Sequence, residues 1–170
     1  MRTEAALGLG GNLGDPLQAF ATALRSLADH SGITVDRYSS VYRTKPWGIV
    51  EQPDFLNMAV LLSTDVREVE LLNICIALEH AAGRERRERW GPRTLDLDIL
   101  TFGDLVTDRP SLQLPHPRIA KRAFVLVPLV EIAPDLMIDG RSAASLMAGL
   151  DRDDVVLDVT ETARLRDLMG

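Results

Sequence analysis

The sequence predicts an α+β fold in which helices cover an antiparallel sheet. Apolar runs with the two-residue period of a strand alternate with segments of helical period, and glycine or proline stands at the boundaries between them. The chain has 170 residues, 46% hydrophobic and 26% charged, which suits one ordinary globular domain. We therefore expect a single domain over residues 1–170, with a core at about 5–134 and a C-terminal tail, 141–170, of unknown role.

The first predicted elements are a strand, a glycine loop and a helix. Residues 5–9 form a short apolar run that ends in the loop Gly-Gly-Asn-Leu-Gly at 10–14. Asp15 and Pro16 then read as an N-cap followed by proline in the first helical turn. Apolar residues recur at helical spacing from Leu17 to about residue 29, so this helix turns one apolar stripe to the core.

Two strands are expected next, at residues 33–42 and 55–62, because β-branched and apolar residues dominate both segments. If residues 55–62 are extended, alternate side chains from Phe55 to Leu61, Asn57 among them, share one face. The connection 43–54 contains Pro46, Gly48 and Pro53 and is predicted to be irregular. Long irregular connections in compact domains are more often functional than idle.

The second helix is expected at residues 66–82, where apolar residues recur at helical offsets and Gly83 supplies a C-terminal stop. Residues 94–101 alternate strictly, which predicts a half-buried strand. Segment 118–133 is ambiguous between helix and strand, and 142–150 is weakly helical. The order β-α-β-β-α-β predicts a ferredoxin-like core with both helices on one face of the sheet, followed by a C-terminal extension.

Charge and composition exclude several classes of function. The chain has 19 Lys and Arg against 25 Asp and Glu, a net charge of −6, which argues against binding nucleic acid or an anionic membrane through bulk charge. No segment approaches the ~20 apolar residues that span a bilayer. A single cysteine, Cys75, cannot form an internal disulfide, so a cytoplasmic setting is expected.

A local cluster of positive charge occupies residues 84–93, where five arginines accompany two glutamates. Guanidinium groups bind phosphate oxygens bidentately and stay charged at working pH, which suits a polyphosphate ligand. A solvated loop would have the same composition, so this stretch alone does not decide between the two. A second, weaker basic cluster follows at 116–122 and includes His116 and Arg122.

Asp96 and Asp98 lie two residues apart on the polar face of the predicted strand, with Cα atoms roughly 6.6 Å apart. Their carboxylates can converge on a cation, and two Mg²⁺ ions with phosphate oxygens would suit the pair. Alternating Asp residues on the solvent-exposed face of a strand are also common in proteins that bind no metal there. The neighbouring arginines favour the metal interpretation, because a metal-bound triphosphate needs both kinds of group. Neither a dinucleotide-binding G-x-G-x-x-G nor a P-loop occurs.

The longest motif is Arg-Trp-Gly-Pro-Arg-Thr-Leu-Asp-Leu-Asp-Ile at residues 89–99, accompanied by Gly-Gly-Asn-Leu-Gly at 10–14, Thr-Lys-Pro-Trp-Gly at 44–48, Gln-Pro-Asp-Phe-Leu-Asn at 52–57 and Leu-Pro-His at 114–116. Together these strongly resemble the 6-hydroxymethyl-7,8-dihydropterin pyrophosphokinases of folate biosynthesis, from about residue 5 to 134. That family has the ferredoxin-like α+β fold. It transfers the β,γ-pyrophosphoryl group of ATP to the hydroxymethyl oxygen of the pterin and releases AMP.

The resemblance implies a role for individual residues. Asp96 and Asp98 would hold two Mg²⁺ ions and, with Arg86 and Arg93, form the catalytic set. The ATP-binding residues would be Arg84, Arg86, Arg93, Ile99, His116 and Arg122, and the pterin-binding residues Thr44, Lys45, Trp47, Phe55, Asn57 and Phe124. Glu79 matches a family acid whose role stays open. No nucleic-acid, membrane or protein partner is implied.

Two other functions share some of these residues. A two-metal phosphohydrolase would also use the aspartates and arginines, but it would release phosphate without an acceptor. A non-catalytic nucleic-acid module on the same fold would need a basic surface and aromatic residues on the sheet, and the net charge of −6 speaks against it.

Overall fold

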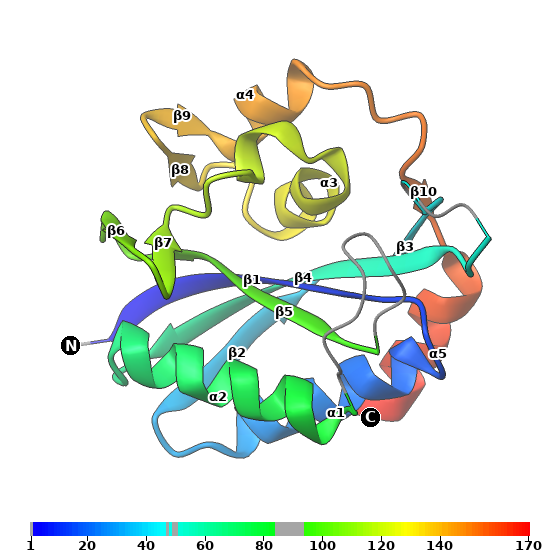
Figure 1. Ribbon diagram of the computed structural model, residues 1–170, viewed down its shortest axis with the longest axis horizontal. Coiled ribbons are helices and arrows are strands. Elements are labelled where there is room, and N and C mark those ends of the chain that lie inside the picture. The colour runs from blue at the N-terminus through cyan, green and yellow to red at the C-terminus, as the bar shows by residue number, and fades with distance from the viewer. Residues whose placement is uncertain (1, 47, 49–50, 84–93) are drawn as a thin grey trace.

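The computed structural model describes residues 2–46, 48, 51–83 and 94–170. Strands and the helices α1 and α2 make up the first part of the chain, and mostly shorter elements follow (Figure 1). In chain order they are β1 (Thr3–Gly11), α1 (Pro16–Asp29), β2 (Ile33–Tyr38), β3 (Tyr42–Thr44), β4 (Phe55–Thr64), α2 (Glu68–Ala81), β5 (Asp96–Phe102), β6 (Thr107–Arg109), β7 (Leu112–Leu114), the 3₁₀ turn η1 (Ile119–Lys121), α3 (Ala123–Ile132), β8 (Met137–Ile138), β9 (Arg141–Ser142), α4 (Ala143–Ala148), β10 (Val156–Leu157) and α5 (Val159–Met169).

The main sheet is antiparallel, with β4 at its centre, and β1 lies between β4 and the edge strand β5. Both β2 and β3 pair with β4, and β10 adds to the outer edge of β3. The register places Gly10 of β1 between Asn57 of β4 and Asp96 of β5. Residues far apart in the sequence are thereby brought together at one end of the sheet.

Helices cover both faces of this sheet (Figure 1). The face that carries α1, α2 and α5 forms the larger core, which includes Phe20 of α1, Leu71 of α2 and Leu165 of α5. The opposite face carries α3 and α4 over a smaller core, which includes Leu100 of β5 and Leu126 of α3. The prediction of an α+β fold with an antiparallel sheet is confirmed, and the two predicted helices share one face.

The helix signals in the sequence are confirmed at the first two helices. The side chain of Asp15 accepts a hydrogen bond from the backbone N–H of Gln18 at 3.2 Å, and Pro16 opens α1. Gly83 follows α2 with φ of +82°, the left-handed conformation that a helix-ending glycine adopts at little cost.

The strand predicted at 33–42 is wrong in one respect, because it is divided into β2 and β3. The chain leaves the ladder at residues 39–41, where the Ser39 N–H donates to the Ala59 carbonyl and the Ser39 hydroxyl accepts from the Ala59 N–H, each at 2.9 Å. The chain then rejoins β4 as β3, so the first two residues of the predicted irregular connection 43–54 belong to a strand.

The helix α3 differs from what the sequence predicted for its own segment, and it changes the burial expected for β5. The segment left ambiguous at 118–133 is helical from Ala123 to Ile132, although it contains Pro128 and several β-branched residues. Packing of this helix on the sheet outweighs its local preferences. It also buries Leu100, so β5 is covered on both faces in its second half and is not a half-buried strand throughout.

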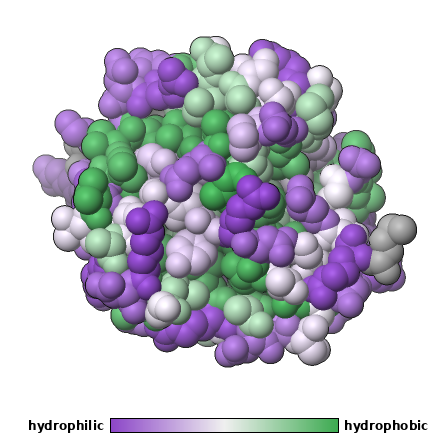
Figure 2. Space-filling view, turned by 180° about the vertical axis from the view of Figure 1, so that it is seen from behind, coloured by the Kyte–Doolittle hydropathy of each residue, from purple (hydrophilic) through white to green (hydrophobic). Residues whose placement is uncertain are grey.

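The C-terminal tail is more regular than its sequence indicates. The weakly helical stretch is confirmed as α4, which Ser142 caps by accepting from the Ser145 N–H at 3.1 Å. The helix α5 was not predicted from the sequence. Seen from behind, the surface mixes hydrophilic and hydrophobic areas (Figure 2). Within the described residues, no helix is long and apolar enough to cross a membrane.

Candidate active site

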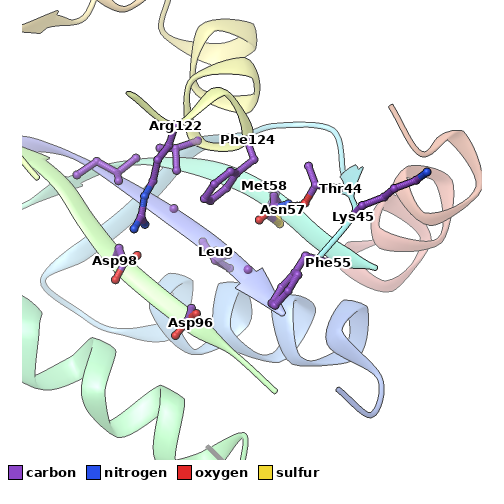
Figure 3. Close-up of a pocket in the computed structure, with 14 residues that line it drawn as sticks. Leu9, Thr44, Lys45, Phe55, Asn57, Met58, Asp96, Asp98, Arg122 and Phe124 are labelled. Carbon is purple, nitrogen blue, oxygen red and sulfur yellow. Dashed lines mark hydrogen bonds between the residues drawn. The ribbon is translucent and has the colours of Figure 1, made fainter. Parts of the chain in front are cut away.

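One cavity opens between the end of the sheet and the N-terminus of α3, and most of the predicted site residues line it (Figure 3). Its walls come from β1, β4, β5, the end of β3 and the start of α3. The lining residues are Gly8, Leu9, Gly10, Thr44, Lys45, Phe55, Asn57, Met58, Asp96, Asp98, Leu100, Arg122, Phe124 and Val125.

One end of the cavity is acidic. Asp96 and Asp98 point into it from the same face of β5, whereas Leu97 turns to the larger core. The buried carboxylate of Glu79 in α2 accepts a hydrogen bond from the backbone N–H of Leu97 at 2.9 Å. This bond ties the strand to α2 between the two aspartates. Glu79 therefore holds the backbone that presents them.

Basic groups face these carboxylates. Arg122, at the start of α3, extends toward Asp98 (Figure 3). Burial lowers the pKa of Arg122, the charge of Arg118 adds to this, and the charges of Asp98 and Asp96 oppose it. A guanidinium group remains protonated at working pH despite such a shift. The opposite charges of Arg122 and Asp98 thus share one wall of the cavity.

His116 lies beside this acidic end without lining the cavity. Burial is the main cause that lowers the pKa of His116, the charge of Asp98 opposes it, and the charges of Arg122 and Arg118 reinforce it. The ring is therefore neutral near pH 7. Its Nδ1 accepts a hydrogen bond from the backbone N–H of Arg118 at 3.2 Å, which places the proton of the neutral ring on Nε2.

The other end of the cavity is aromatic. The ring of Phe124 descends from α3, and that of Phe55 stands at the start of β4 (Figure 3). The Arg122 guanidinium lies 5.6 Å from the centre of the Phe124 ring, within the range of a cation–π contact. Two half-buried rings at one cavity suit a flat apolar or heterocyclic ligand.

Between these rings lies a polar group that is fixed in orientation. The Asn57 amide nitrogen donates a hydrogen bond to the Thr44 hydroxyl at 3.0 Å, and both residues are buried. The amide group also lies against Gly10, because a Cβ at that glycine would be 3.2 Å from Asn57 Oδ1. Lys45 follows Thr44 at the rim. A buried amide held in this way can distinguish donors from acceptors on a ligand.

The floor of the cavity contains residues that the sequence analysis did not assign. Gly8 and Gly10 of β1 line it, together with Met58 and the apolar side chains of Leu100 and Val125. Glycines at alternate positions of a strand leave one face without side chains, which marks close approach by a ligand or another backbone. The alternate spacing of Gly8 and Gly10 in the sequence is the signal that could have identified this floor. The prediction instead placed Gly8 in the apolar strand and Gly10 in the loop at residues 10–14.

The remaining predicted site residues do not line the cavity or lie outside the described residues. The Ile99 side chain is buried in the larger core, on the face of β5 opposite Asp98, so it does not point into the cavity. Trp47, Arg84, Arg86 and Arg93 fall outside the residues that the structure describes.

Sequence and structure comparisons place the chain among known proteins. The family profile described as 7,8-dihydro-6-hydroxymethylpterin-pyrophosphokinase matches residues 6–134. A 2-amino-4-hydroxy-6-hydroxymethyldihydropteridine pyrophosphokinase of Methylorubrum extorquens is 46% identical over 149 residues, 88% of this chain and 94% of the relative. Its namesake in Synechocystis is 44% identical over 150 residues, 88% of this chain and 76% of the relative.

The fold has known counterparts as well. The wild-type HPPK-DHPS structure of Plasmodium falciparum superposes with a TM-score of 0.67 at 14% identity. The match covers 87% of this chain and 44% of that one, so this chain spans less than half of the longer protein. This likeness concerns the fold alone, whereas the family profile and the relatives above 40% identity cover most of the chain. The chain therefore belongs to the 7,8-dihydro-6-hydroxymethylpterin-pyrophosphokinase family.

Proposed function

We propose that this cavity is the site at which the enzyme transfers the β,γ-pyrophosphoryl group of ATP to 6-hydroxymethyl-7,8-dihydropterin, in folate biosynthesis. The products are AMP and the pterin diphosphate. The observation that carries the assignment of the site is its two chemically different ends: two aromatic rings with a buried amide at one, and two carboxylates with an arginine at the other. A planar heterocycle and a polyphosphate each find a matching surface in one continuous space.

The pterin belongs at the aromatic end. Phe55 and Phe124 offer ring faces for stacking, and Gly10 leaves room for a flat molecule to lie close to β1 beside Asn57. Asn57 reads the polar edge of the heterocycle through its amide, which Thr44 holds in orientation. Neutral hydrogen-bonding groups suit a pterin because its ring edge carries both donors and acceptors without a full charge.

The triphosphate belongs at the acidic and basic end. Arg122 supplies a fixed positive charge, and neutral His116 donates from Nε2. Arg84, Arg86 and Arg93 complete the phosphate-binding set in this proposal on the strength of the sequence motif. Charge neutralisation and positioning supply most of the catalysis in phosphoryl-transfer enzymes, so no side chain is assigned as general base.

Two Mg²⁺ ions are part of the proposal, and the donor chemistry fits them. Asp96 and Asp98 are hard oxygen ligands that share one wall of the cavity. Among the described residues no group of three or more His, Cys, Asp or Glu could hold a metal, so phosphate oxygens and water would complete the coordination. Mg²⁺ is usually bound in this way, through one or two carboxylates and its nucleotide. Bound there, it would offset the negative charge of the phosphates.

The transfer itself exchanges one P–O bond for another. The hydroxymethyl oxygen of the pterin attacks the β-phosphorus of ATP and loses its proton, and the bond between that phosphorus and the α,β-bridging oxygen breaks. AMP carries away that oxygen. The two halves of the cavity serve this step by holding the hydroxymethyl group in line with the bond that breaks.

Acceptor-dependent formation of AMP tests the proposal. The protein is incubated with ATP and Mg²⁺, with and without 6-hydroxymethyl-7,8-dihydropterin, and the nucleotides are separated by chromatography. We expect AMP only when the pterin is present. ADP as the main product would reject pyrophosphoryl transfer, and equal turnover without the pterin would favour the phosphohydrolase alternative.

Two finer assignments belong to the same proposal. A ferredoxin-like core is supported by the strand order β5-β1-β4-β2 and by α1 and α2 on one face. A cytoplasmic setting is supported by the single cysteine, Cys75, which is buried. Burial, together with the charges of Glu79 and Asp98, raises the pKa of its thiol to about 12, which disfavours the reactive thiolate form.

A further inference from the structure

The C-terminal tail lies against the strand that supports the aromatic end of the cavity. β10 pairs antiparallel with the outer edge of β3, with Val156 opposite Arg43 and Leu157 opposite Tyr42. The inner edge of β3 pairs with β4, where Thr44 is opposite Phe55. The three-residue strand β3 therefore lies between β10 of the tail and β4, the strand that carries Phe55 and Asn57.

Two tail residues make polar side-chain or backbone contacts with the segment 41–43, at the start of β3. The backbone N–H of Asp158 donates to the Val41 carbonyl at 2.9 Å, and the Asp158 carboxylate binds Arg43 at 2.8 and 2.9 Å. The hydroxyl of Thr162 accepts from the Val41 N–H at 2.9 Å. Val41 is buried and lies in the break between β2 and β3, outside their ladders. The tail therefore supplies hydrogen-bond partners for a buried backbone that the sheet does not pair.

Hydrophobic burial by β10 itself contributes little to this attachment. Val156 and Leu157 remain 58% and 47% exposed, although Leu165 of α5 is fully buried in the larger core. The carboxylate of Asp158 also caps α5 by accepting from the Glu161 N–H at 2.9 Å. One residue thus begins the helix and binds the strand. The tail therefore supports β3 mainly through these polar contacts, in addition to the pairing of β3 with β4.

The position of β3 matters to the site because of its last residue. Thr44 accepts the hydrogen bond that orients the Asn57 amide, and Lys45 follows at the cavity rim. We propose that Thr162 and Asp158 are positioning residues for the pterin half of the site: they fix β3 from outside, so that Thr44 holds Asn57 in its binding orientation. This inference rests on the proposed placement of the pterin between Phe55 and Phe124.

The test compares two substitutions at Thr162 with a control in the same helix. Thr162→Val removes the hydroxyl while keeping the size of the side chain. Thr162→Ser keeps the hydroxyl and removes only the methyl group. Arg164→Gln is the matched control, because Arg164 attaches α5 to Asp15 at 2.5 and 3.1 Å and does not contact β3. The Kd of the pterin is measured with a non-hydrolysable ATP analogue present, the Kd of that analogue is measured alone, and thermal unfolding monitors the fold.

We expect Thr162→Val to raise the pterin Kd about tenfold, equivalent to about 1.4 kcal/mol, with the nucleotide Kd nearly unchanged. Thr162→Ser should restore wild-type affinity, and Arg164→Gln should lower the Tm without changing the pterin Kd. If Thr162→Val does not fold, Asp158→Asn gives the same information, because asparagine keeps the helix cap while removing the charge that binds Arg43.

Two results would contradict a positioning role for Thr162, and a third would contradict the proposed function. An unchanged pterin Kd in folded Thr162→Val would overturn the inference and leave the tail a purely structural role. A loss of pterin affinity in Arg164→Gln equal to that in Thr162→Val would overturn it too, because general loosening of α5 would then suffice. Failure of the wild-type protein to bind the pterin would instead reject the proposed function.

Discussion

The glycine floor of the cavity offers a sharp test of how the pterin site is built. Gly8 and Gly10 lie on the same strand and face, two residues apart, and both line the cavity. A Cβ at Gly10 would stand 3.2 Å from Asn57 Oδ1, whereas the nearest atoms to a Cβ at Gly8 are those of the Leu100 side chain at 3.6 Å. Gly10→Ala and Gly8→Ala therefore add the same methyl group next to very different neighbours.

The structure indicates how large the difference should be. A contact of 3.2 Å requires the neighbour to yield by a few tenths of an ångström, and Asn57 is buried and bonded to Thr44 at 3.0 Å. Disturbing a buried hydrogen bond costs about 1–3 kcal/mol, so Gly10→Ala should weaken pterin binding between about fivefold and about 150-fold. Gly8→Ala meets an ordinary contact and should weaken binding by less than about threefold.

Titration of each variant with the pterin, in the presence of a non-hydrolysable ATP analogue, measures these affinities. Urea unfolding provides the control for folding, because replacing glycine by alanine within a strand should stabilise by about 0.5–1 kcal/mol where space allows. Gly8→Ala should show that gain and Gly10→Ala should not. Equal weakening of pterin binding by both variants would refute the reasoning, since the Asn57 amide would then not be the group that matters.

Three further predictions follow from the acidic end of the cavity. Asp96→Ala or Asp98→Ala should abolish Mg²⁺-dependent AMP formation with Tm nearly unchanged, and normal turnover at saturating Mg²⁺ would rule out their role. Glu79→Ala removes the acceptor of the buried Leu97 N–H and should lower the free energy of unfolding by about 1–3 kcal/mol, as measured by urea unfolding. An unchanged free energy of unfolding would show that β5 does not need this hydrogen bond. The folded-state pKa of His116 lies below its ordinary value of about 6.5, so the unfolded protein takes up this proton at a higher pH than the folded protein does. The free energy of unfolding should therefore fall as the pH drops from about 6.5 toward the lowered pKa. Unfolding titrations at several pH values should show this loss in the wild type and a smaller one in His116→Asn.

Much of the fold could be predicted because its signals are local. The N-cap at Asp15, the proline that follows it and the left-handed Gly83 each act through a few neighbouring residues. The alternation of Asp96 and Asp98 with apolar residues correctly separated the two faces of β5. The helix α3 could not be assigned in the same way, because its composition favours a strand and its packing on the sheet decides the outcome.

The site was predicted largely through the resemblance of its motifs, and the structure brings many of those residues together. Thr44, Lys45, Phe55, Asn57, Asp96, Asp98, Arg122 and Phe124 line one cavity. Their spacing along the chain could not indicate this, because strand pairing across β1 joins residues more than 30 positions apart. Gly8 and Gly10 were not assigned to the site, because a glycine-rich connection between a strand and a helix is more simply explained as a tight turn than as a ligand-binding segment.

The sequence by itself determined the strand–helix–strand–strand–helix–strand order of the core, without the division of its second strand into β2 and β3. It also determined the charged residues that suit a polyphosphate and the family to which they point. Only the tertiary structure decided how β3 is held. Its support comes from Thr162 and Asp158, more than 100 residues away, and from Glu131 of α3, whose carboxylate accepts from the Tyr42 hydroxyl at 2.6 Å. A three-residue strand has too few local contacts to hold its position, so contacts that close long loops of chain supply the rest.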